Sequence, residues 1–328
     1  MVINMGDFWI WIPIAAAILA CILLAVAYIT YRIAFYNKHK EDFDPFFPPH
    51  RATSYPFVER SNGLITSLMA EPCEVVEITA RDGKRLVGRY YHRADGAPLD
   101  IMFHGYMSGA MHDFPGGALE AMRAGHNVLL VDQRGHGGSH GRTVSFGIKE
   151  RYDCVDWANF AVERFGSDIE IILVGISMGA ATVLYASELE LPREVRGIIA
   201  DCPYSSAEKM IRKTAAEMGI PAGIAFPFVR LGGRIFGGFD VCERTVLEAV
   251  RGARLPLLLY HGIDDDLVPY EMSRELAEAY GGEAELLLFE GARHGTSYLV
   301  DTDRYVTALG RFYEKILKKR RLHYDEAG

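Results

Sequence analysis

The sequence predicts an alpha/beta protein in which helices flank a mostly parallel central sheet. Short apolar runs rich in Val, Ile and Leu alternate with helical patterns along most of the chain, as in repeated strand–helix units. Several of these runs end directly in Gly, His, Asp or Ser, and ligands of open parallel sheets bind at such strand ends. With 328 residues and 49% apolar composition, the chain is long enough for one large domain and an additional segment.

Residues 8–31 form this additional segment, because they contain no charged side chain. A helix over these residues would be roughly 36 Å long at 1.5 Å per residue, which is enough to cross a bilayer with some tilt. A cleaved signal peptide fits less well, since Asp7 but no Lys or Arg precedes the run and the run exceeds the usual apolar region. A lipoprotein box at Cys21 is a further alternative, although the apolar run continues well beyond it. We therefore predict an uncleaved transmembrane anchor.

Basic residues follow the predicted anchor but do not precede it. Arg32, Lys38 and Lys40 lie just after the apolar run. Because positively charged flanks stay inside the cell, we expect a single-pass protein of the cell membrane with the rest of the chain in the cytoplasm. Residues 32–70 are then a juxtamembrane linker, and its proline-rich segment 44–49 cannot lie inside a helix. The aromatic residues of this segment contact either the membrane interface or the domain.

The strands and helices beyond the linker are predicted in chain order. Residues 73–80 and 84–92 form a strand hairpin around the turn at 81–83. Further strands are expected at residues 100–103, 127–131, 169–174, 256–260 and 284–289, and helices at residues 150–165, 180–188, 207–218, 273–280 and 302–319.

Two pentapeptides fit the pattern Gly-x-Ser-x-Gly, but only one has the context of a catalytic serine. Residues 175–179 follow the apolar run 169–174 and precede a helical pattern, so Ser177 is expected on a sharp strand-to-helix turn, a nucleophile elbow. Residues 137–141, which contain Ser139, neither follow a strand directly nor open a helix, and we interpret them as a loop. A serine hydroxyl attacks a carbonyl only if a neighbouring base accepts its proton. The assignment of Ser177 as the nucleophile therefore depends on motifs that supply such a base.

A serine, an acid and a histidine follow predicted strands in that order. Ser177, the three aspartates at 264–266, and His294 each come just after a strand pattern, and His104 follows an earlier strand. Because the carboxyl ends of parallel strands meet at one edge of a sheet, these groups are expected to lie close together.

These motifs, taken in order, resemble those of the alpha/beta-hydrolase superfamily, and most of all its membrane-anchored serine aminopeptidase-like and lysophospholipase-like members. The resemblance covers roughly residues 73–320. It implies an alpha/beta-hydrolase domain over residues 71–322, with a helical cap insertion at about 203–254. Within the insertion, residues 220–229 are apolar and interrupted by prolines. They either pack on the edge of the sheet or form an apolar acyl pocket, and both alternatives remain open.

The resemblance implies a catalytic triad of Ser177, Asp265 and His294. In this arrangement His294 is the base that takes the proton of the serine hydroxyl. The competing histidines are His104 and His136. The resemblance gives His104 a structural role, and we expect His136 to form hydrogen bonds within its own turn.

The acid has several candidates in the sequence, because three aspartates are consecutive. The acid must accept the second imidazole N–H and stabilise the imidazolium. The family pattern H-G-x-x-D-x-x-V-P falls on Asp265, whereas Asp264 and Asp266 are expected to accept backbone N–H groups in the turn. Asp201, at the end of the preceding strand, is a position that some hydrolases use instead.

The resemblance also implies an oxyanion hole made of main-chain donors. In the family one N–H follows the nucleophile, here Met178, and the other comes from the loop after the His-Gly strand, here Tyr106. Main-chain donors tolerate almost any side chain, so the assignment depends on position alone.

These observations predict a serine hydrolase that cleaves carboxylic esters, with acyl esters or lysophospholipid-like molecules as substrates. A serine peptidase or an acyltransferase is the alternative within enzymes, and a catalytically silent membrane scaffold is the alternative outside them. The net charge of −8 argues against a nucleic-acid partner. Five cysteines without a C-x-x-C pair or metal-ligand spacing indicate no metal site, and no organic cofactor is expected. The expected partners are a lipid or small-molecule ester and, through the anchor, the membrane.

Overall fold

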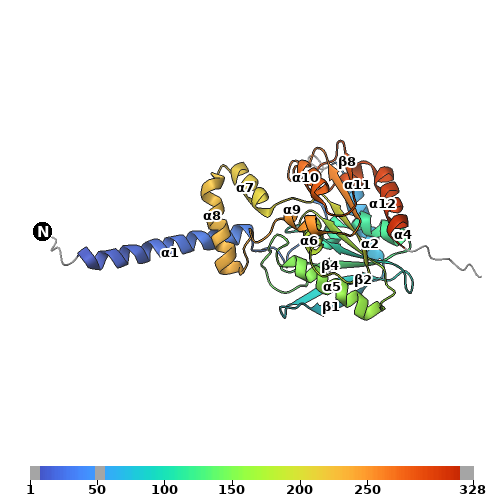
Figure 1. The fold of residues 1–328 in the computed structure, drawn as a ribbon, viewed down its shortest axis with the longest axis horizontal. Helices are drawn as coiled ribbons and strands as arrows, with labels where there is room; N and C mark the ends of the chain where they lie inside the picture. Colours follow the sequence, from blue (N-terminus) through green and yellow to red (C-terminus); the bar gives the residue numbers. More distant parts are fainter. Residues whose placement is uncertain (1–7, 49–55, 318–328) are drawn as a thin grey trace, which may run out of the picture.

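An eight-stranded sheet forms the centre of the molecule (Figure 1). The computed structural model describes residues 8–48 and 56–317. The strand order is β1-β2-β4-β3-β5-β6-β7-β8, with β1 and β2 antiparallel, β2 antiparallel to β4, and the later pairs parallel. The strands are β1 (Glu74–Thr79), β2 (Arg85–Tyr91), β3 (Leu99–Phe103), β4 (Asn127–Asp132), β5 (Ile171–Ile176), β6 (Val195–Asp201), β7 (Leu257–Gly262) and β8 (Ala284–Phe289). The mostly parallel sheet and the amino-terminal hairpin predicted from the sequence are confirmed.

Helices cover both faces of the sheet and enclose two apolar layers. In β3, Leu99, Ile101 and Phe103 belong to one layer and Met102 to the other, because successive side chains of a strand point to opposite faces. The first layer includes side chains of α5 (Glu150–Phe165), α6 (Met178–Ala186) and α10 (Glu271–Ala279). The second includes side chains of α4 (Pro115–Arg123) and α12 (Thr302–Ile316). Two short helices, α3 (Ala110–Asp113) and α11 (Ser297–Val300), lie at strand ends.

The predicted helices agree with these elements except at their ends. The helix expected at 150–165 has those bounds, whereas α6 and α10 each begin two residues earlier than expected. The helix α12 ends at Ile316, and the last two residues of the expected helix lie outside the described residues. The helix α4 was not predicted from the sequence.

The segment interpreted as a linker contains a helix that the sequence analysis missed. The helix α2 (Val58–Ala70) contributes Leu68 to the second apolar layer. Its buried residues are Val58, Ser61, Ile65 and Leu68, at the three- and four-residue spacing of one helix face. That periodicity was the signal available in the sequence. It is weak, because only Ile65 and Leu68 among the four side chains are large and apolar. The part of the linker at 49–55 lies outside the described residues.

The helix α1 (Phe8–Ala34) extends away from the domain (Figure 1). Among the described residues it is the one helix that is long and apolar enough to cross a membrane, with a mean hydropathy of 2.7 over its best window in Trp11–Ala34. It continues three residues beyond the predicted anchor. One face of its carboxyl end is covered, since Ala27, Tyr31 and the following Phe35 are buried against the rest of the molecule.

The insertion between β6 and β7 is helical, as predicted. It consists of α7 (Ala207–Glu217), α8 (Ala222–Gly232), a π-helical turn at Gly233–Gly237, α9 (Val246–Ala249) and a 3-10 turn at Val250–Gly252. The helix α8 runs across α1 in Figure 1. The apolar residues at 220–229 therefore meet α1 as well as the domain, a contact that neither predicted alternative included.

Candidate active site

Ser177 lies on the sharp turn between β5 and α6. Its backbone has φ 55° and ψ −115°, a conformation that residues other than glycine rarely adopt. The turn leaves no room for a side chain at Gly179, where a Cβ would collide with the carbonyl oxygen of Phe103. The strand-to-helix context predicted for residues 175–179 is therefore present, and it holds the serine hydroxyl beyond the end of the sheet.

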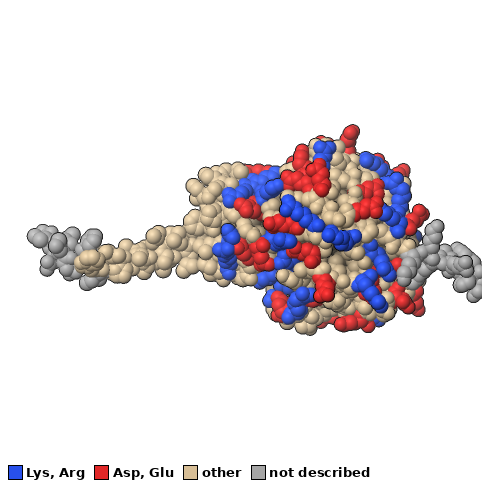
Figure 2. All heavy atoms as spheres, in the orientation of Figure 1, with Lys and Arg blue, Asp and Glu red and all other residues tan. Residues whose placement is uncertain are grey.

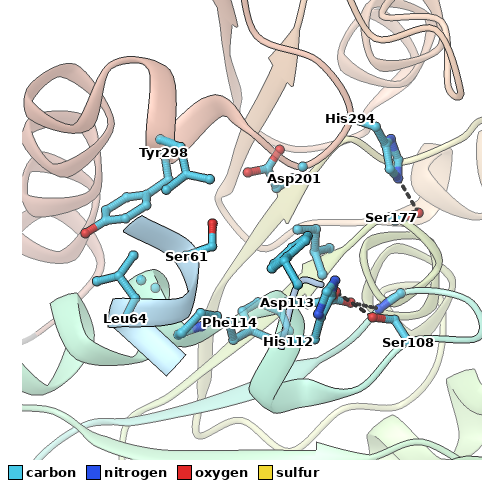
Figure 3. Close-up of a pocket in the computed structure, with 18 of the residues that line it drawn as sticks. Ser61, Leu64, Ser108, His112, Asp113, Phe114, Ser177, Asp201, His294 and Tyr298 are labelled. Carbon is cyan, nitrogen blue, oxygen red and sulfur yellow. Dashed lines mark hydrogen bonds between the residues drawn. The ribbon is translucent and has the colours of Figure 1, made fainter. Parts of the chain in front are cut away.

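A continuous chain of hydrogen bonds joins Ser177, His294 and Asp265, and Figure 3 shows its first part, from Ser177 to His294. The Nε2 atom of His294 lies 2.9 Å from the Oγ atom of Ser177. The Nδ1 atom of the same ring lies 2.7 Å from an Oδ atom of Asp265. With a neutral imidazole, Nδ1–H donates to the carboxylate and Nε2 is free to accept the serine proton, which is the geometry that general-base activation requires.

The environment of Asp265 keeps its carboxyl group ionised. One oxygen accepts the backbone N–H groups of Leu267 and Val268 at 2.9 and 2.8 Å. Burial by itself raises the pKa of Asp265, but hydrogen bonds from His261, His294 and the Val268 N–H outweigh burial and hold that pKa well below its ordinary value. A carboxylate at this position is suited to stabilise an imidazolium.

His261 is a second histidine on Asp265, and the sequence analysis assigned it no role. Its Nε2 atom lies 2.9 Å from the carbonyl oxygen of Val268 and 3.2 Å from the Asp265 carboxylate. A carbonyl oxygen only accepts, so Nε2 carries the hydrogen and Nδ1 accepts from the Ser273 hydroxyl at 2.6 Å. The sequence signal for this role of His261 was its position as the first residue of the pattern H-G-x-x-D.

The two aspartates beside Asp265 do not have the contacts expected of them. We expected Asp264 and Asp266 to accept backbone N–H groups in the turn, but Asp265 itself accepts them. Asp266 is exposed and forms an ion pair with Arg293. The expectation was wrong because the buried Asp265 carboxylate is the one within hydrogen-bond distance of the Leu267 and Val268 N–H groups.

Asp201 is close to the triad but does not bond to His294. Its carbonyl oxygen accepts the N–H of Ser177 at 2.8 Å, which ties the elbow to the neighbouring strand. The residue is only 7% exposed, and one of its carboxyl oxygens has no hydrogen-bond partner among the described residues. Burial raises the pKa of Asp201 to about 6. The geometry thus favours Asp265 over Asp201 as the partner of the histidine.

The competing residues have structural contacts. The Nε2 atom of His104 accepts the N–H of Gln133 at 3.1 Å, and its Nδ1–H donates to the carbonyl of Gly105 at 2.8 Å. His136 donates to the carbonyl of Arg134 at 3.0 Å. Ser139 is buried and donates to the carbonyl of Asp132 at 2.5 Å. In none of these described contacts does a histidine ring bond to a serine hydroxyl, so none of them is a nucleophile–base pair.

The two predicted oxyanion donors lie on the segments that meet at Ser177. Met178 is the first residue of α6, where a backbone N–H has no intrahelical acceptor. The neighbours of Tyr106 are held in place, since Gly105 N–H donates to Asp113 at 2.6 Å and Met107 N–H donates to His136 at 3.1 Å. No hydrogen bond described for residues 8–48 and 56–317 uses the N–H of Tyr106 or of Met178. Both donors are thus free for a ligand.

A cavity of about 630 Å³ opens beside the triad. In Figure 3, Ser177 and His294 lie at one end and Leu64, Ser61 and Tyr298 at the other. Most of its lining side chains are apolar or aromatic: Phe43, Phe46, Phe47, Leu64, Met107, Phe114, Val174, Ile176, Ile199, Leu267, Tyr298, Leu299 and Tyr305. No described residue at 203–254 lines this cavity. The segment interpreted as a linker lines it instead, so the predicted acyl-pocket role of the insertion is not found.

Cys202, Asp265 and His294 have ligand atoms within 4.8 Å of one another, close enough to hold a metal ion. However, two of these residues are hydrogen-bonded to each other, and burial raises the pKa of the Cys202 thiol well above its ordinary value. A thiol that stays protonated is a poor metal ligand, so the hydrogen-bonded chain explains this cluster better than a metal site does.

Comparison with known proteins gives the same class of fold. A family model described as alpha/beta hydrolase fold matches residues 101–219. The uncharacterized protein YqkD of Bacillus subtilis is 28% identical over 193 residues, which cover 58% of this chain and 63% of that protein. Protein ABHD12B of Homo sapiens is 27% identical over 204 residues, covering 56% of this chain and 50% of that protein. The matches therefore span less than two thirds of both relatives.

A solved structure resembles most of the domain. The Pyrococcus furiosus esterase Pf2001 superposes with a TM-score of 0.64 and 26% sequence identity, covering 77% of this chain and 94% of the esterase. The alpha/beta-hydrolase fold predicted from the sequence is thereby confirmed, and similarity to an esterase supports a hydrolase in general terms.

Proposed function

We propose that this chain, which belongs to the alpha/beta-hydrolase superfamily, hydrolyses carboxylic esters through an acyl-serine intermediate. The observation that carries the proposal is the hydrogen-bonded chain from Ser177 through His294 to Asp265. A serine is a weak nucleophile unless a base is within hydrogen-bond reach and is itself oriented by a third group. Both conditions are met by the distances of 2.9 and 2.7 Å.

The proposed reaction has two halves with the same proton carrier. As the Ser177 Oγ atom attacks the ester carbonyl, His294 Nε2 accepts the hydroxyl proton and Asp265 stabilises the imidazolium. The oxyanion accepts the N–H groups of Met178 and Tyr106. The imidazolium then gives its proton to the leaving alcohol, which departs and leaves an acyl-serine. Water attacks that carbonyl in the second half, again with His294 as base, and releases the acid and the free serine.

The lining of the cavity supports an acyl group as the part of the substrate that it binds. Apolar and aromatic side chains dominate from Ser177 to Leu64, and such a surface binds hydrocarbon by excluding water. Acyl esters and lysophospholipid-like molecules have a chain of this kind. We therefore propose them as substrates.

The proposal includes anchoring in the cell membrane. The helix α1 supports a single-pass anchor, and Arg32, Lys38 and Lys40 at its carboxyl end support a cytoplasmic catalytic domain. The division into an anchor at 8–31, a juxtamembrane segment at 32–70 and a hydrolase domain at 71–322 belongs to the same proposal. Anchoring would keep the active site close to lipid substrates.

A serine peptidase is a second candidate, favoured by one observation. A peptidase that removes residues from a free amino terminus needs an acidic group for the ammonium. The carboxyl group of Asp201 lines the cavity that contains Ser177. Aminoacyl amides therefore belong in the substrate test beside esters.

The test combines an active-site probe with graded substrates. A fluorophosphonate should label the wild-type chain at Ser177, and p-nitrophenyl esters should be hydrolysed with a preference that changes with acyl length. Faster turnover of aminoacyl amides than of any ester would favour the peptidase. No labelling and no turnover of either class would favour the scaffold and contradict the enzyme.

A further inference from the structure

The helical insertion exposes large apolar side chains in α8 and on either side of it. We use the term apolar tip for Met218, Ile220, Ile224, Ile235 and Phe236, whose exposed fractions run from 38% to 64%. Residues 218–229 carry no charge at all. A patch of this kind on a protein surface usually marks an interaction site. The active-site cavity does not account for it, since no described residue of the insertion lines that cavity.

The insertion is held against α1 by direct contacts. The hydroxyl of Thr30 donates to the carbonyl of Phe228 at 3.0 Å. The backbone at Gly232 approaches α1 so closely that a Cβ at this position would collide with the carbonyl oxygen of Ala27. Because α8 is attached to α1 in this way, the position of α1 in a bilayer determines the position of the apolar tip.

The contact with α8 lies at the depth where α1 would leave a bilayer. From Phe8 to Ala27 the helix rises roughly 29 Å at 1.5 Å per residue, close to the thickness of about 30 Å of a hydrocarbon core. The side chains of α1 are largely exposed up to Ala25. Beyond that point Ala27 and Tyr31 are buried, while Tyr28, Ile29 and Ile33 stay exposed. Since α8 runs across α1 (Figure 1), it would lie along the membrane surface rather than through the membrane.

The charges of the insertion are arranged as in a helix that lies at a membrane surface. The uncharged surface of α1 continues onto the insertion in Figure 2, and charged side chains begin on the side of the domain. Within the insertion, Arg230 and Arg234 form ion pairs with Asp240. An apolar face bordered by basic residues is typical of helices at the boundary between lipid headgroups and acyl chains.

We infer that the apolar tip is a second membrane-contact surface whose partner is the lipid bilayer. The inference rests on the proposed anchoring through α1. A single helix would leave the domain free to tilt, whereas two contacts on one side define its orientation. A second cavity of about 500 Å³ adjoins α1 and shares Phe43, Tyr106 and Met107 with the active-site cavity. The apolar tip would therefore hold this side of the active site against lipid.

Depth-dependent quenching of a fluorophore tests the inference on the full-length chain in nanodiscs. The fluorophore NBD is attached at Ile224→Cys, with the exposed native cysteines removed by Cys21→Ala and Cys73→Ser. Lipids with a nitroxide near the headgroup end of the acyl chain should quench this label, whereas a label on native Cys21, about 9 Å further along α1, should be quenched most by a nitroxide deeper in the chain. A label at Glu163→Cys, on the exposed surface of α5, should be quenched by aqueous iodide instead.

Three results would overturn the inference. Quenching of the Ile224 site by iodide, as strong as at Glu163, would place the apolar tip in water. Protection from both quenchers would indicate a second copy of the chain as its partner. An unquenched label at Cys21 would remove the anchor on which the inference rests. None of these readouts needs turnover, so a failure of the proposed esterase function leaves them unaffected.

Paired charge substitutions provide a functional readout. Ile220→Asp with Ile224→Asp should lower hydrolysis of a long-chain ester presented in vesicles at least several-fold, because a charged tip cannot enter the acyl region. Hydrolysis of water-soluble p-nitrophenyl acetate should stay unchanged. The control Ala216→Asp adds a charge to the exposed surface of α7 outside the tip and should affect neither substrate. An equal loss on both esters would contradict membrane contact.

Discussion

The backbone of Ser177 is strained in a way that a buried structural serine would not need. Positive φ at a residue other than glycine costs on the order of 1–3 kcal/mol and persists only where the surrounding structure imposes it. Here the elbow directs the hydroxyl to within 2.9 Å of His294. The strain is therefore consistent with a catalytic role for Ser177 rather than a packing role.

Replacement of the proposed nucleophile should separate activity from folding. Ser177→Ala should abolish ester hydrolysis and fluorophosphonate labelling, because no other described hydroxyl lies within hydrogen-bond distance of His294 Nε2. The stability should change little, since the hydroxyl makes one described hydrogen bond. Labelling of the purified variant and its urea midpoint measure the two effects.

Ser139→Ala is the matched control, because Ser139 belongs to the other Gly-x-Ser-x-Gly pentapeptide. This hydroxyl accepts the N–H of Val87 at 2.8 Å and donates to the carbonyl of Asp132. Its removal leaves a buried N–H unsatisfied and should cost about 1–3 kcal/mol of stability. Labelling of the folded variant should persist. If Ser139→Ala lost labelling and Ser177→Ala kept it, the nucleophile would be misassigned.

The four candidate acids should respond differently to amide substitution. Asp265→Asn should lower turnover by about 10⁴-fold if a serine protease is a fair guide, because the amide favours the wrong imidazole tautomer. Asp264→Asn and Asp266→Asn should cost far less, since neither carboxylate contacts His294 in the described structure. Turnover of a single p-nitrophenyl ester by the folded variants provides the comparison.

Asp201→Asn is the decisive comparison for the acid. Its carboxyl group is buried near the triad but does not bond to the imidazole. We expect a much smaller loss of turnover than in Asp265→Asn. A collapse of turnover in Asp201→Asn, with Asp265→Asn near wild type, would move the acid to the end of β6.

The buried Asp201 should also change how stability depends on pH. Burial raises the pKa of Asp201 to about 6, roughly two units above that of an unfolded aspartate. The folded state then binds protons more tightly than the unfolded state, so this group lowers stability as the pH rises from about 4 to about 6. At 1.36 kcal/mol per unit, the effect is about 3 kcal/mol.

Asp201→Asn removes this titration while leaving all other groups in place. The difference in unfolding free energy between Asp201→Asn and wild type should therefore shift in favour of the variant by up to about 3 kcal/mol between pH 4 and pH 7. Urea unfolding at both pH values measures it. A difference that is the same at pH 4 and pH 7 would show that the carboxyl titrates normally.

At the scale of elements, α2 connects the amino-terminal segment with the active site. It contributes Leu68 to the apolar layer under the sheet, while Leu64 on the same helix lines the cavity. This helix lies in the segment that the sequence analysis treated as a linker. Its packing makes the segment part of the site that binds substrate.

Filling the cavity from α2 should change the preferred acyl length. Leu64→Trp places a larger side chain at the end of the cavity away from Ser177. Long-chain p-nitrophenyl esters should lose at least tenfold in kcat/KM, whereas the acetate ester should keep its rate, because its acyl group is too short to reach the tryptophan.

Ser67→Trp provides the control on the exposed face of α2 and should leave the chain-length profile unchanged. An unchanged profile in Leu64→Trp would mean that the acyl chain leaves the active site in another direction. An equal loss on all esters would indicate a distorted site instead.

At the scale of the whole molecule, α1 belongs partly to the membrane segment and partly to the domain. Its carboxyl end is continuous with the core, since Phe35 is fully buried and its carbonyl accepts the N–H of Val144 at 2.8 Å. The hydroxyl of Tyr106 donates to the carbonyl of Ala34 at 2.9 Å. A truncation that leaves the core intact must therefore keep the carboxyl end of α1.

Two truncations should behave differently for this reason. Removal of residues 1–22 deletes no buried side chain among the described residues and should leave an active, more soluble protein. Removal of residues 1–35 deletes Ala27, Tyr31 and Phe35, and Phe35→Ala by itself should cost about 3–5 kcal/mol. Urea unfolding and hydrolysis of p-nitrophenyl acetate are measured on both truncated proteins. Equal stability of the two would contradict the packing of α1 on the domain.

The sequence by itself determined where most of the strands lie along the chain and which turns end them. Local apolar runs, glycines and the order of Ser177, Asp265 and His294 predicted the parallel sheet and the groups that meet at its edge. These features are readable because strand periodicity and turn chemistry depend on neighbouring residues. The same information predicted a helical insertion but not that the insertion packs against α1.

Only the tertiary structure decided which apolar surfaces meet. The contact of Thr30 with Phe228 joins residues 198 positions apart, and the bond from His261 to the acid depends on how its turn folds over Val268. An apolar pattern requires that a face be buried but does not specify against what, because the hydrophobic effect has no direction. For this reason α2, in the segment expected to be a linker, lines the cavity, and the insertion, one of whose expected roles was an acyl pocket, packs on α1.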